Sequence, residues 1–370
     1  MRGEPALQGP AMDRPIEADR DMRRGVLYAL LAAALFGAST PFAKLLLADT
    51  RPVLLAGLLY AGSGVGLSAW WGIRGRGQRH APAGHAWRGS ELLWLAGAIT
   101  AGGVLGPVML MTGLRQIPAA NASLLLNMEG VLTAVLAWFA FREHFDRRLL
   151  AGMAAVVAGG VALAWPQRLT LGAGAGAAWV VAACACWAMD NNLTRKVSVR
   201  DPVAIAALKG LVAGAVNLGI AAETGARWPP GAQVLGAALV GLAGYGLSLV
   251  LFVLALRHLG AARTGAYFST APFIGAAASL LLFRQSPAAV FWIAALLMGV
   301  GVWLHLTEEH AHRHSHGRLH HAHGHVHDEH HRHQHDFEWD GREPHDHEHV
   351  HEPLTHAHPH YPDIHHLHGH

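Results

Sequence analysis

The sequence has only two cysteines, Cys184 and Cys186, which lie two positions apart in an apolar stretch. Residues two apart in a helix point to roughly opposite sides, so neither a disulfide framework nor a CxxC metal site is available. Charged residues are scarce too, at 14% of 370 residues, against about a quarter in an ordinary soluble domain. We therefore exclude a disulfide-stabilised secreted fold and expect a chain that lies mostly out of water.

Signatures of catalysis and of nucleic-acid binding are missing as well. The sequence has no Walker phosphate-binding loop and no nucleophile constellation, so we predict neither an enzyme nor ATP-driven activity by this chain alone. The formal net charge is +3, and basic residues gather at the ends of apolar segments. That placement is typical of orientation in a membrane, and we expect no nucleic-acid partner.

Hydrophobic residues make up 52% of the chain and form long stretches. A helix of about 20 apolar residues crosses a hydrocarbon core about 30 Å thick. The predicted fold class is therefore an all-α polytopic membrane protein with ten transmembrane helices in a lipid bilayer. Their ranges are 25–45, 52–72, 91–113, 119–141, 149–165, 173–193, 202–222, 231–256, 261–283 and 287–305.

Basic residues are distributed unevenly between the loops on the two sides of these helices. Placing the N-terminus inside puts fifteen lysine and arginine residues on the cytoplasmic side and six on the other. Because cytoplasmic loops carry the excess of positive charge, we expect both termini in the cytoplasm of a multi-pass protein of the plasma or inner membrane.

The two halves of the apolar region resemble each other. Leu114-Arg-Gln-Ile-Pro-Ala-Ala120 returns 142 positions later as Leu256-Arg-His-Leu-Gly-Ala-Ala262, and the same offset places Phe141 on Phe283. We predict a duplicated five-helix unit, whose second copy is inverted because five is odd. Chance similarity between apolar helices is the alternative. The predicted parts are a polar N-terminus, two repeats and a tail, at 1–24, 25–168, 169–305 and 306–370.

Several motifs carry a resemblance to a known family. They are Phe36-Gly-Ala-Ser-Thr-Pro-Phe-Ala-Lys44, Leu126-Asn-Met-Glu-Gly130, Phe141-Arg-Glu143 and, in the second copy, Gly265-Ala-Tyr-Phe-Ser-Thr-Ala-Pro-Phe273 with Phe283-Arg284. In these motifs and their order the chain resembles the EamA family of the drug/metabolite transporter superfamily. The resemblance implies ten-helix carriers that export metabolites, amino acids, sugars or drugs by alternating access. It implies a small-molecule substrate without naming it.

Few charged residues lie inside the predicted spans, and each is a candidate functional residue because a charge in hydrocarbon is costly. Glu129 lies ten residues into the fourth span, about 15 Å along the helix and close to the bilayer midplane. Its counterpart region in the second copy is Ala271-Pro272. A glutamate that faces a proline break across a pseudo-twofold axis suits a substrate site. A glutamate paired with a neighbouring helix for assembly alone is the alternative.

Eight further residues complete the predicted substrate path. Lys209, about 10 Å deep in the seventh span, is placed to neutralise Asp190 or Glu129, or to meet an anionic substrate. For Lys44 the alternative is that its ammonium group snorkels to the lipid headgroups. For Asp190 the alternative is a position at a solvated helix end. The others are Asn121, Asn127, Tyr267, Ser269 and Pro272.

The tail holds most of the histidines: 25 of 29 lie in the last 66 residues. Few large apolar residues are present there to form a core, so we expect the tail to be disordered. Neutral imidazole binds Zn, Ni, Co and Cu, and we predict that the tail binds these metals with poor selectivity, whereas the helices require no cofactor. The candidate ligands are His310, His312, His314, His316, His320, His321, His323, His325, His327, His330, His331, His333, His335, His345, His347, His349 and His351.

Three functions stay open at this point. The first is a secondary active exporter of a small organic metabolite or drug, regulated by its tail through metal or through pH, since free imidazole titrates at about pH 6.5. The second is a divalent transition-metal carrier, although the spans hold no histidine well inside the lipid. The third is a membrane-anchored metal buffer or sensor. The oligomeric state, a homodimer included, also stays open.

Overall fold

The structure of the protein is a computed structural model. It describes residues 14–75, 89–141, 147–165, 174–194 and 202–306, and four segments of the tail, 310–316, 319–325, 345–351 and 354–360. The chain divides into two units, Met1–Thr307 and Glu308–His370.

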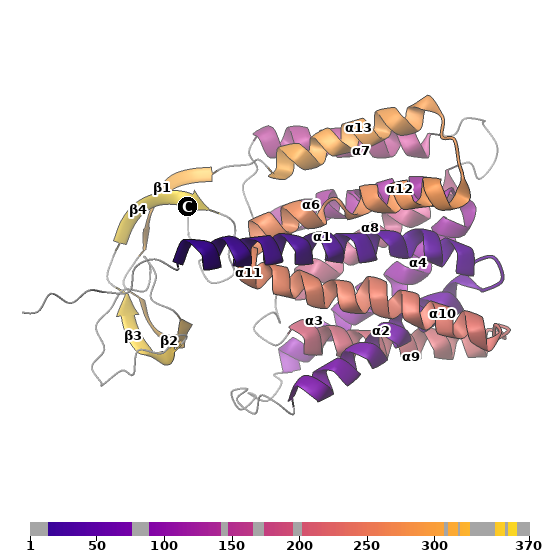
Figure 1. The fold of residues 1–370 in the computed structure, drawn as a ribbon, viewed down its shortest axis with the longest axis horizontal. Helices are drawn as coiled ribbons and strands as arrows, with labels where there is room; N and C mark the ends of the chain where they lie inside the picture. The colour runs from indigo at the N-terminus through magenta and orange to yellow at the C-terminus, as the bar shows by residue number, and fades with distance from the viewer. Residues whose placement is uncertain are drawn as a thin grey trace, which may run out of the picture. The chain divides into compact units, whose positions relative to one another are not determined.

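The first unit is a bundle of helices (Figure 1). Its first half comprises α1 (Arg14–Leu46), α2 (Pro52–Gly75), α3 (Gly89–Ala98), the π-helix η1 (Ile99–Leu105), α4 (Gly106–Gln116), α5 (Ala119–Leu125), α6 (Met128–Phe141) and α7 (Arg147–Ala164). Its second half comprises α8 (Ala175–Thr194), α9 (Pro202–Glu223), α10 (Gly231–Gly241), the π-helix η3 (Leu242–Leu247), α11 (Ser248–Phe268), α12 (Ala271–Phe283) and α13 (Ala289–Leu306).

Helices are present at all ten predicted ranges, and eight helical stretches among the described residues are long and apolar enough to cross a membrane. The other two positions are α8, whose last turns carry the polar run Asp190-Asn-Asn192, and α13, whose apolar part spans only Ala289–Leu304. The all-helical expectation is confirmed for the described residues of this unit. The number of ten spans stays a prediction.

Helix α11 contains a reversal of chain direction. The rings of Phe252 and Phe268 lie 4.9 Å apart, although a straight helix would separate these residues by about 24 Å. The chain therefore turns back between them. Helix α1 lies alongside α11 (Figure 1). The ring pair Tyr28–His258 joins α1 to the region of the reversal, and Phe36–Phe268 joins it to the arm that leads to α12.

Helices α2 and α9 pack through their backbones. Gly64 lies so close to Gly210 that a Cβ on either would overlap the other residue's backbone, and Gly214 lies against Ala61 in the same way. Lower-numbered residues of α2 meet higher-numbered residues of α9, so the two helices are antiparallel. Small residues allow this approach in a bilayer, where helices gain no hydrophobic drive for association.

Helices α7 and α13 lie side by side (Figure 1) and are also antiparallel. Gly159 lies against Met298, and Gly301 lies against Val156. Adding the offset of 142 positions to 159 gives 301, and adding it to 156 gives 298. The two contacts are therefore equivalent, with the roles of the two helices exchanged.

The irregular points of the helices recur with the same spacing. Adding 142 to the last residue of η1, Leu105, gives Leu247, the last residue of η3. The break between α5 and α6 at Leu126–Asn127 and the break between α11 and α12 at Ser269–Thr270 agree with this offset to within one residue. The two halves therefore share local distortions as well as sequence.

Apolar side chains occupy both the inside and the outside of the helical unit. Leu55, Met111 and Leu125, from α2, α4 and α5, are 0% exposed and belong to one large core cluster. Phe139 and Leu281 are 71% and 80% exposed. An exterior with so many exposed large apolar residues fits contact with hydrocarbon rather than with water.

The second unit contains four strands, β1 (His310–His316), β2 (Leu319–His325), β3 (His345–His351) and β4 (Leu354–His360). β1 pairs antiparallel with β4, and β2 pairs antiparallel with β3. Strand pairing satisfies the backbone groups of these four segments without a hydrophobic core, and the disorder expected for the tail as a whole stays a prediction. The remaining predicted metal ligands lie outside the described residues: His327, His330, His331, His333 and His335.

Candidate functional site

Glu129 stands in the first turn of α6, directly after the helix break. Its Oε1 accepts a hydrogen bond of 2.9 Å from the side-chain amide of Asn191 on α8. The same amide lies 3.5 Å from the hydroxyl of Thr133, one turn further along α6. The half-buried glutamate therefore faces a helix of the other half of the chain rather than lipid.

Asp190 lies next to Asn191 on α8 and is buried, with 7% of its surface exposed. The ammonium group of Lys209, on α9, lies 2.5 and 2.7 Å from its two carboxylate oxygens. The hydroxyl of Thr194 donates a further bond of 2.8 Å to Oδ1. Lys209 thus pairs with Asp190, one of the three partners that the sequence left open, and Asp190 does not lie at a solvated helix end.

Gly102 of η1 makes room for the Asp190 carboxylate. A Cβ at Gly102 would overlap the carboxylate group, so the absence of a side chain allows the acid to lie directly against this backbone. This position demands glycine for reasons of space, and its dihedral angles do not require one. The contact joins α8 to the π-helical turn of the first half.

The carbonyl group of Gly102 is freed from its own helix. In an α-helix the N–H of Gly106 would donate to the Gly102 carbonyl, but here it donates to the carbonyl of Ala101, as in a π-helix. Pro107, the next possible donor, has no N–H. The carbonyl oxygen instead accepts hydrogen bonds of 2.9 Å from the Tyr60 hydroxyl and from the indole N–H of Trp187. The π-helical turn is therefore tied to α2 and α8 through side chains.

Aromatic rings join the two halves beside this centre. The ring of Tyr245, from η3, lies 5.5 Å from the ring of Tyr60 and 6.0 Å from that of Phe36, measured between centroids. Such pairs add about 0.5–1.5 kcal/mol beyond the burial of their area. The contact therefore links η3 of the second half to α1 and α2 of the first.

The second half repeats the glycine contact with different chemistry. Gly244, which follows Gly102 by 142 positions, lies against Ser39. Ser39 corresponds to Asp190 when residues 36–44 are aligned in sequence with residues 187–195. When Arg51-Pro-Val53 is aligned with Asp201-Pro-Val203, the position that corresponds to Lys209 is Leu59. The carboxylate and lysine of the ion pair therefore have no charged counterparts at Ser39 and Leu59.

Lys44 closes the end of α4. Its ammonium group donates to the carbonyl oxygens of Leu114, Arg115 and Ile117, at 2.5 to 3.3 Å. The last carbonyl groups of a helix have no partner within the helix, and a cation there also favours the helix dipole. Lys44 therefore serves as a cap rather than as a free cation, and its position relative to the lipid headgroups stays a prediction.

Four of the residues predicted for the substrate path lie at or beside the two helix breaks. The Asn127 amide is buried and donates a 2.9 Å hydrogen bond to the carbonyl of Leu124. The Ser269 hydroxyl donates to its own backbone, at the carbonyl of Ala266. Pro272 occupies the first turn of α12, where a missing N–H costs nothing. Tyr267, one residue before the end of α11, is half-buried.

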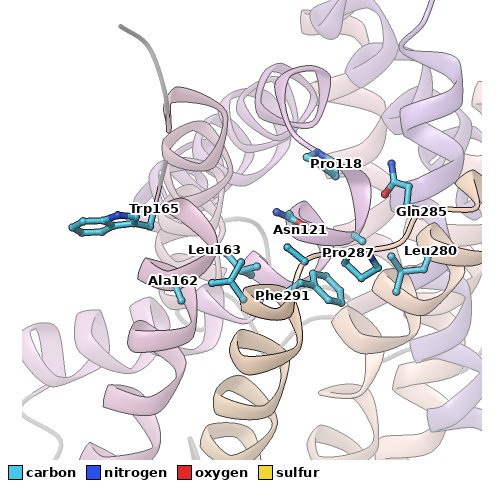
Figure 2. Close-up of a pocket in the computed structure, with 12 residues that line it drawn as sticks. Pro118, Asn121, Ala162, Leu163, Trp165, Leu280, Gln285, Pro287 and Phe291 are labelled. Atoms are coloured by element: carbon cyan, nitrogen blue, oxygen red, sulfur yellow. The ribbon is translucent and has the colours of Figure 1, made fainter. Parts of the chain in front are cut away.

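Asn121 lines a pocket of about 350 Å³ that is separate from Glu129, which lies about 12 Å further along the helical path. Figure 2 shows Asn121 among the labelled side chains and the ring of Trp165 turned away from them. Most of the lining is apolar, and Gln285 adds a second amide. The sequence indicated Asn121 but not the pocket.

Among the residues whose side chains the structure describes, no group of three or more His, Cys, Asp or Glu lies close enough to hold a metal ion.

Long apolar helices with an apolar exterior define a multi-pass membrane protein, in contact with the lipid bilayer. The model of the EamA-like transporter family matches the chain twice, at residues 23–165 and 174–307. The chain therefore belongs to the EamA-like transporter family, and the predicted membership is confirmed.

Two relatives add to this result. An uncharacterized transporter of Methanothermobacter thermautotrophicus is 28% identical over 301 residues, which cover 76% of this chain and 87% of the relative. A solved crystal structure of a protein matches with a TM-score of 0.55 at 18% identity, over 76% of this chain and 96% of that chain. At this identity, the second likeness concerns the fold alone.

Proposed function

We propose that the protein is a secondary active carrier of a small organic molecule, built from two inverted five-helix repeats with ten spans. The two matches of one family model support the duplication. The exchanged contacts of α7 and α13 and the antiparallel course of α2 and α9 support a twofold axis perpendicular to the helices. Such an axis gives the two halves opposite orientations, as in carriers that work by alternating access.

The substrate path passes a polar centre between the halves, made by Glu129, Asn191, Asp190 and Lys209. The observation that carries this assignment is the hydrogen bond between Glu129 and Asn191, which directs an intramembrane carboxyl group at the other half. Lys209 neutralises Asp190 by contact, whereas Glu129 is bonded by a neutral amide. Glu129 is therefore the residue assigned to bind a proton or a cationic group of the substrate.

The ion pair serves as a latch at one end of the path. It joins α8, α9 and η1, whereas the related place at Ser39 and Gly244 lacks charges. Opening the path at the end of Asp190 separates opposite charges, but opening the other end does not. If the protein lies in the cell membrane with both termini in the cytoplasm, the end of the path that carries the Asp190–Lys209 ion pair is the cytoplasmic end. Export is the direction that the family resemblance suggests.

The test is transport into proteoliposomes under an imposed pH gradient, with amino acids, sugars and cationic drugs as candidate substrates and Zn²⁺ and Co²⁺ as the metal arm. Glu129→Gln is expected to abolish accumulation that depends on the gradient. Glu223→Gln, at an exposed helix end, is the matched control and is expected to keep it. Gradient-driven accumulation by Glu129→Gln at the wild-type rate would refute the role of Glu129. Transport of metal ions alone would instead support the metal carrier.

A further inference from the structure

The pocket that Asn121 lines lies between the two halves of the chain. The beginning of α5 and the end of α7 line it from the first half, and the end of α12 and the beginning of α13 line it from the second. Its volume of about 350 Å³ falls within the range of small-molecule sites, about 300–1,000 Å³. The pocket is therefore large enough for a small ligand, at a place that the polar centre around Glu129 does not use.

The lining of this pocket is apolar apart from two side-chain amides. Leu163, Leu280 and Phe291 belong to the apolar part, and Phe291 is buried. Asn121 comes from α5, and Gln285 comes from the link between α12 and α13. Figure 2 shows both amide groups above Leu280 and Phe291 in this view. All twelve lining residues are described, and none of them is charged.

The backbone directly before Gln285 has an unusual conformation. Arg284 ends α12 with φ 50° and ψ 42°, and among the described residues it is the only one other than glycine with a positive φ. This left-handed conformation costs an ordinary residue about 1–2 kcal/mol. The turn is closed by a 3.1 Å hydrogen bond from the N–H of Gln285 to the carbonyl of Leu280. It places Gln285 in the pocket lining beside Leu280, and backbone strain of this kind is often found at ligand sites.

The related positions in the other half of the chain carry charges. When the offset of 142 positions is added or subtracted, Asn121, Gln285, Ala288 and Val290 correspond to Arg263, Glu143, Asp146 and Arg148. The two halves share their helix breaks, but only one of these two related places has a neutral sequence. The neutral lining is therefore a property of this end of the protein rather than of the repeated fold.

We propose that the pocket binds an uncharged amphiphile, which has an apolar chain and one carbonyl or carboxamide group. The chain lies against Leu163, Leu280 and Phe291, and the polar group is bonded by the amides of Asn121 and Gln285. Each side-chain amide both donates and accepts hydrogen bonds, so a neutral carboxamide can be matched at its oxygen and its nitrogen. A carboxylate or an ammonium group would find no opposite charge in this lining and would lose its hydration.

Two sources offer this chemistry, an ester carbonyl of a membrane lipid and a free carboxamide. The indole of Trp165, at the rim of the pocket, is 72% exposed. Tryptophan is enriched at the boundary between hydrocarbon and water. The pocket is therefore within reach of both sources, and the experiment has to separate them.

The test is photolabelling of the full chain in nanodiscs with octanamide that carries a diazirine on its chain. The fraction of labelling that an excess of plain octanamide removes is mapped by mass spectrometry of peptides. This saturable labelling is expected at the ends of α5, α7, α12 and α13 that line the pocket. The matching octanoate probe, which differs in its charge, is expected to give none.

Four variants, each taken from its monodisperse fraction, test the assignment. Asn121→Leu and Gln285→Leu keep the side-chain volume and remove one amide each, so each is expected to raise the half-saturating probe concentration by about 2- to 12-fold. Ala162→Phe places a ring in the pocket and is expected to abolish saturable labelling. Gln116→Leu removes an exposed amide that does not line the pocket, and it is expected to behave as the wild type.

Three results would overturn the proposal: saturable labelling mapped to other helices, wild-type affinity in both amide variants, or equal labelling by the octanoate probe. The two sources are separated by comparing nanodiscs of ester-linked and ether-linked phosphatidylcholine. Stronger labelling in the ether-linked lipid would show that lipid esters compete for the pocket, which supports the proposal with a lipid as the occupant. Equal labelling in both supports it with a free carboxamide as the occupant.

Discussion

Removal of the Lys209 charge is the perturbation whose effect follows most directly from the structure. The side chains of Lys209 and Asp190 are 17% and 10% exposed, so the pair is buried rather than superficial. Exposed pairs contribute at most about 1 kcal/mol, but removal of one partner from a buried pair costs about 3–5 kcal/mol. Lys209→Met leaves the Asp190 carboxylate against the Gly102 backbone without a counter-charge. We therefore expect the larger cost.

The double variant Asp190→Asn with Lys209→Met separates charge from contact. It leaves no uncompensated charge, and we expect it to lie within about 1–2 kcal/mol of the wild type. The assay is unfolding in detergent micelles by added sodium dodecyl sulfate, followed by tryptophan fluorescence. Arg227→Met, in an exposed loop, is the control. An unchanged midpoint for Lys209→Met, or single effects that simply add in the double variant, would refute a buried, coupled pair.

Three further predictions concern the surroundings of this pair. Gly102→Ala places a methyl group against the Asp190 carboxylate and should lower the free energy of unfolding by about 1–3 kcal/mol. Gly219→Ala is the control and should be neutral, because no atom lies within 4 Å of its added Cβ. Thermal unfolding in detergent compares the two variants. Lys44→Met removes the cap of α4 and should cost about 1.5–3 kcal/mol, so a wild-type unfolding temperature would contradict the capping role. Tyr60→Phe removes one bond to a freed carbonyl and should cost about 0.5–1.5 kcal/mol in the same assay.

The positions of the helices were predictable because apolar runs of membrane length mark them directly. The reversal inside α11 also follows from the sequence, since Arg257 and His258 interrupt an apolar run too long for one crossing. The strands of the tail were missed for a physical reason. The sequence argument asked whether a hydrophobic core was possible, and paired strands satisfy their backbone groups without one.

The polar centre was predictable only in part. Glu129 stands out because it is a charged residue deep in an apolar run. Its partner Asn191 was missed because the contact depends on how α6 and α8 are rotated toward each other, which one sequence does not reveal. The role of Gly102 was missed likewise, as its value lies in the Asp190 carboxylate that packs against it. The capping contact of Lys44 was missed because its carbonyl partners are about 70 positions away in the chain.

The opposite orientation of the two halves is tested most directly by one labelling experiment. Gln116 and His258 are exposed and are separated by the repeat offset of 142 positions. Each is replaced by cysteine in a chain that lacks Cys184 and Cys186, and intact cells are treated with a membrane-impermeant maleimide. The account predicts labelling of Gln116→Cys from outside and of His258→Cys only after permeabilisation. Labelling of both from the same side of the membrane would contradict it.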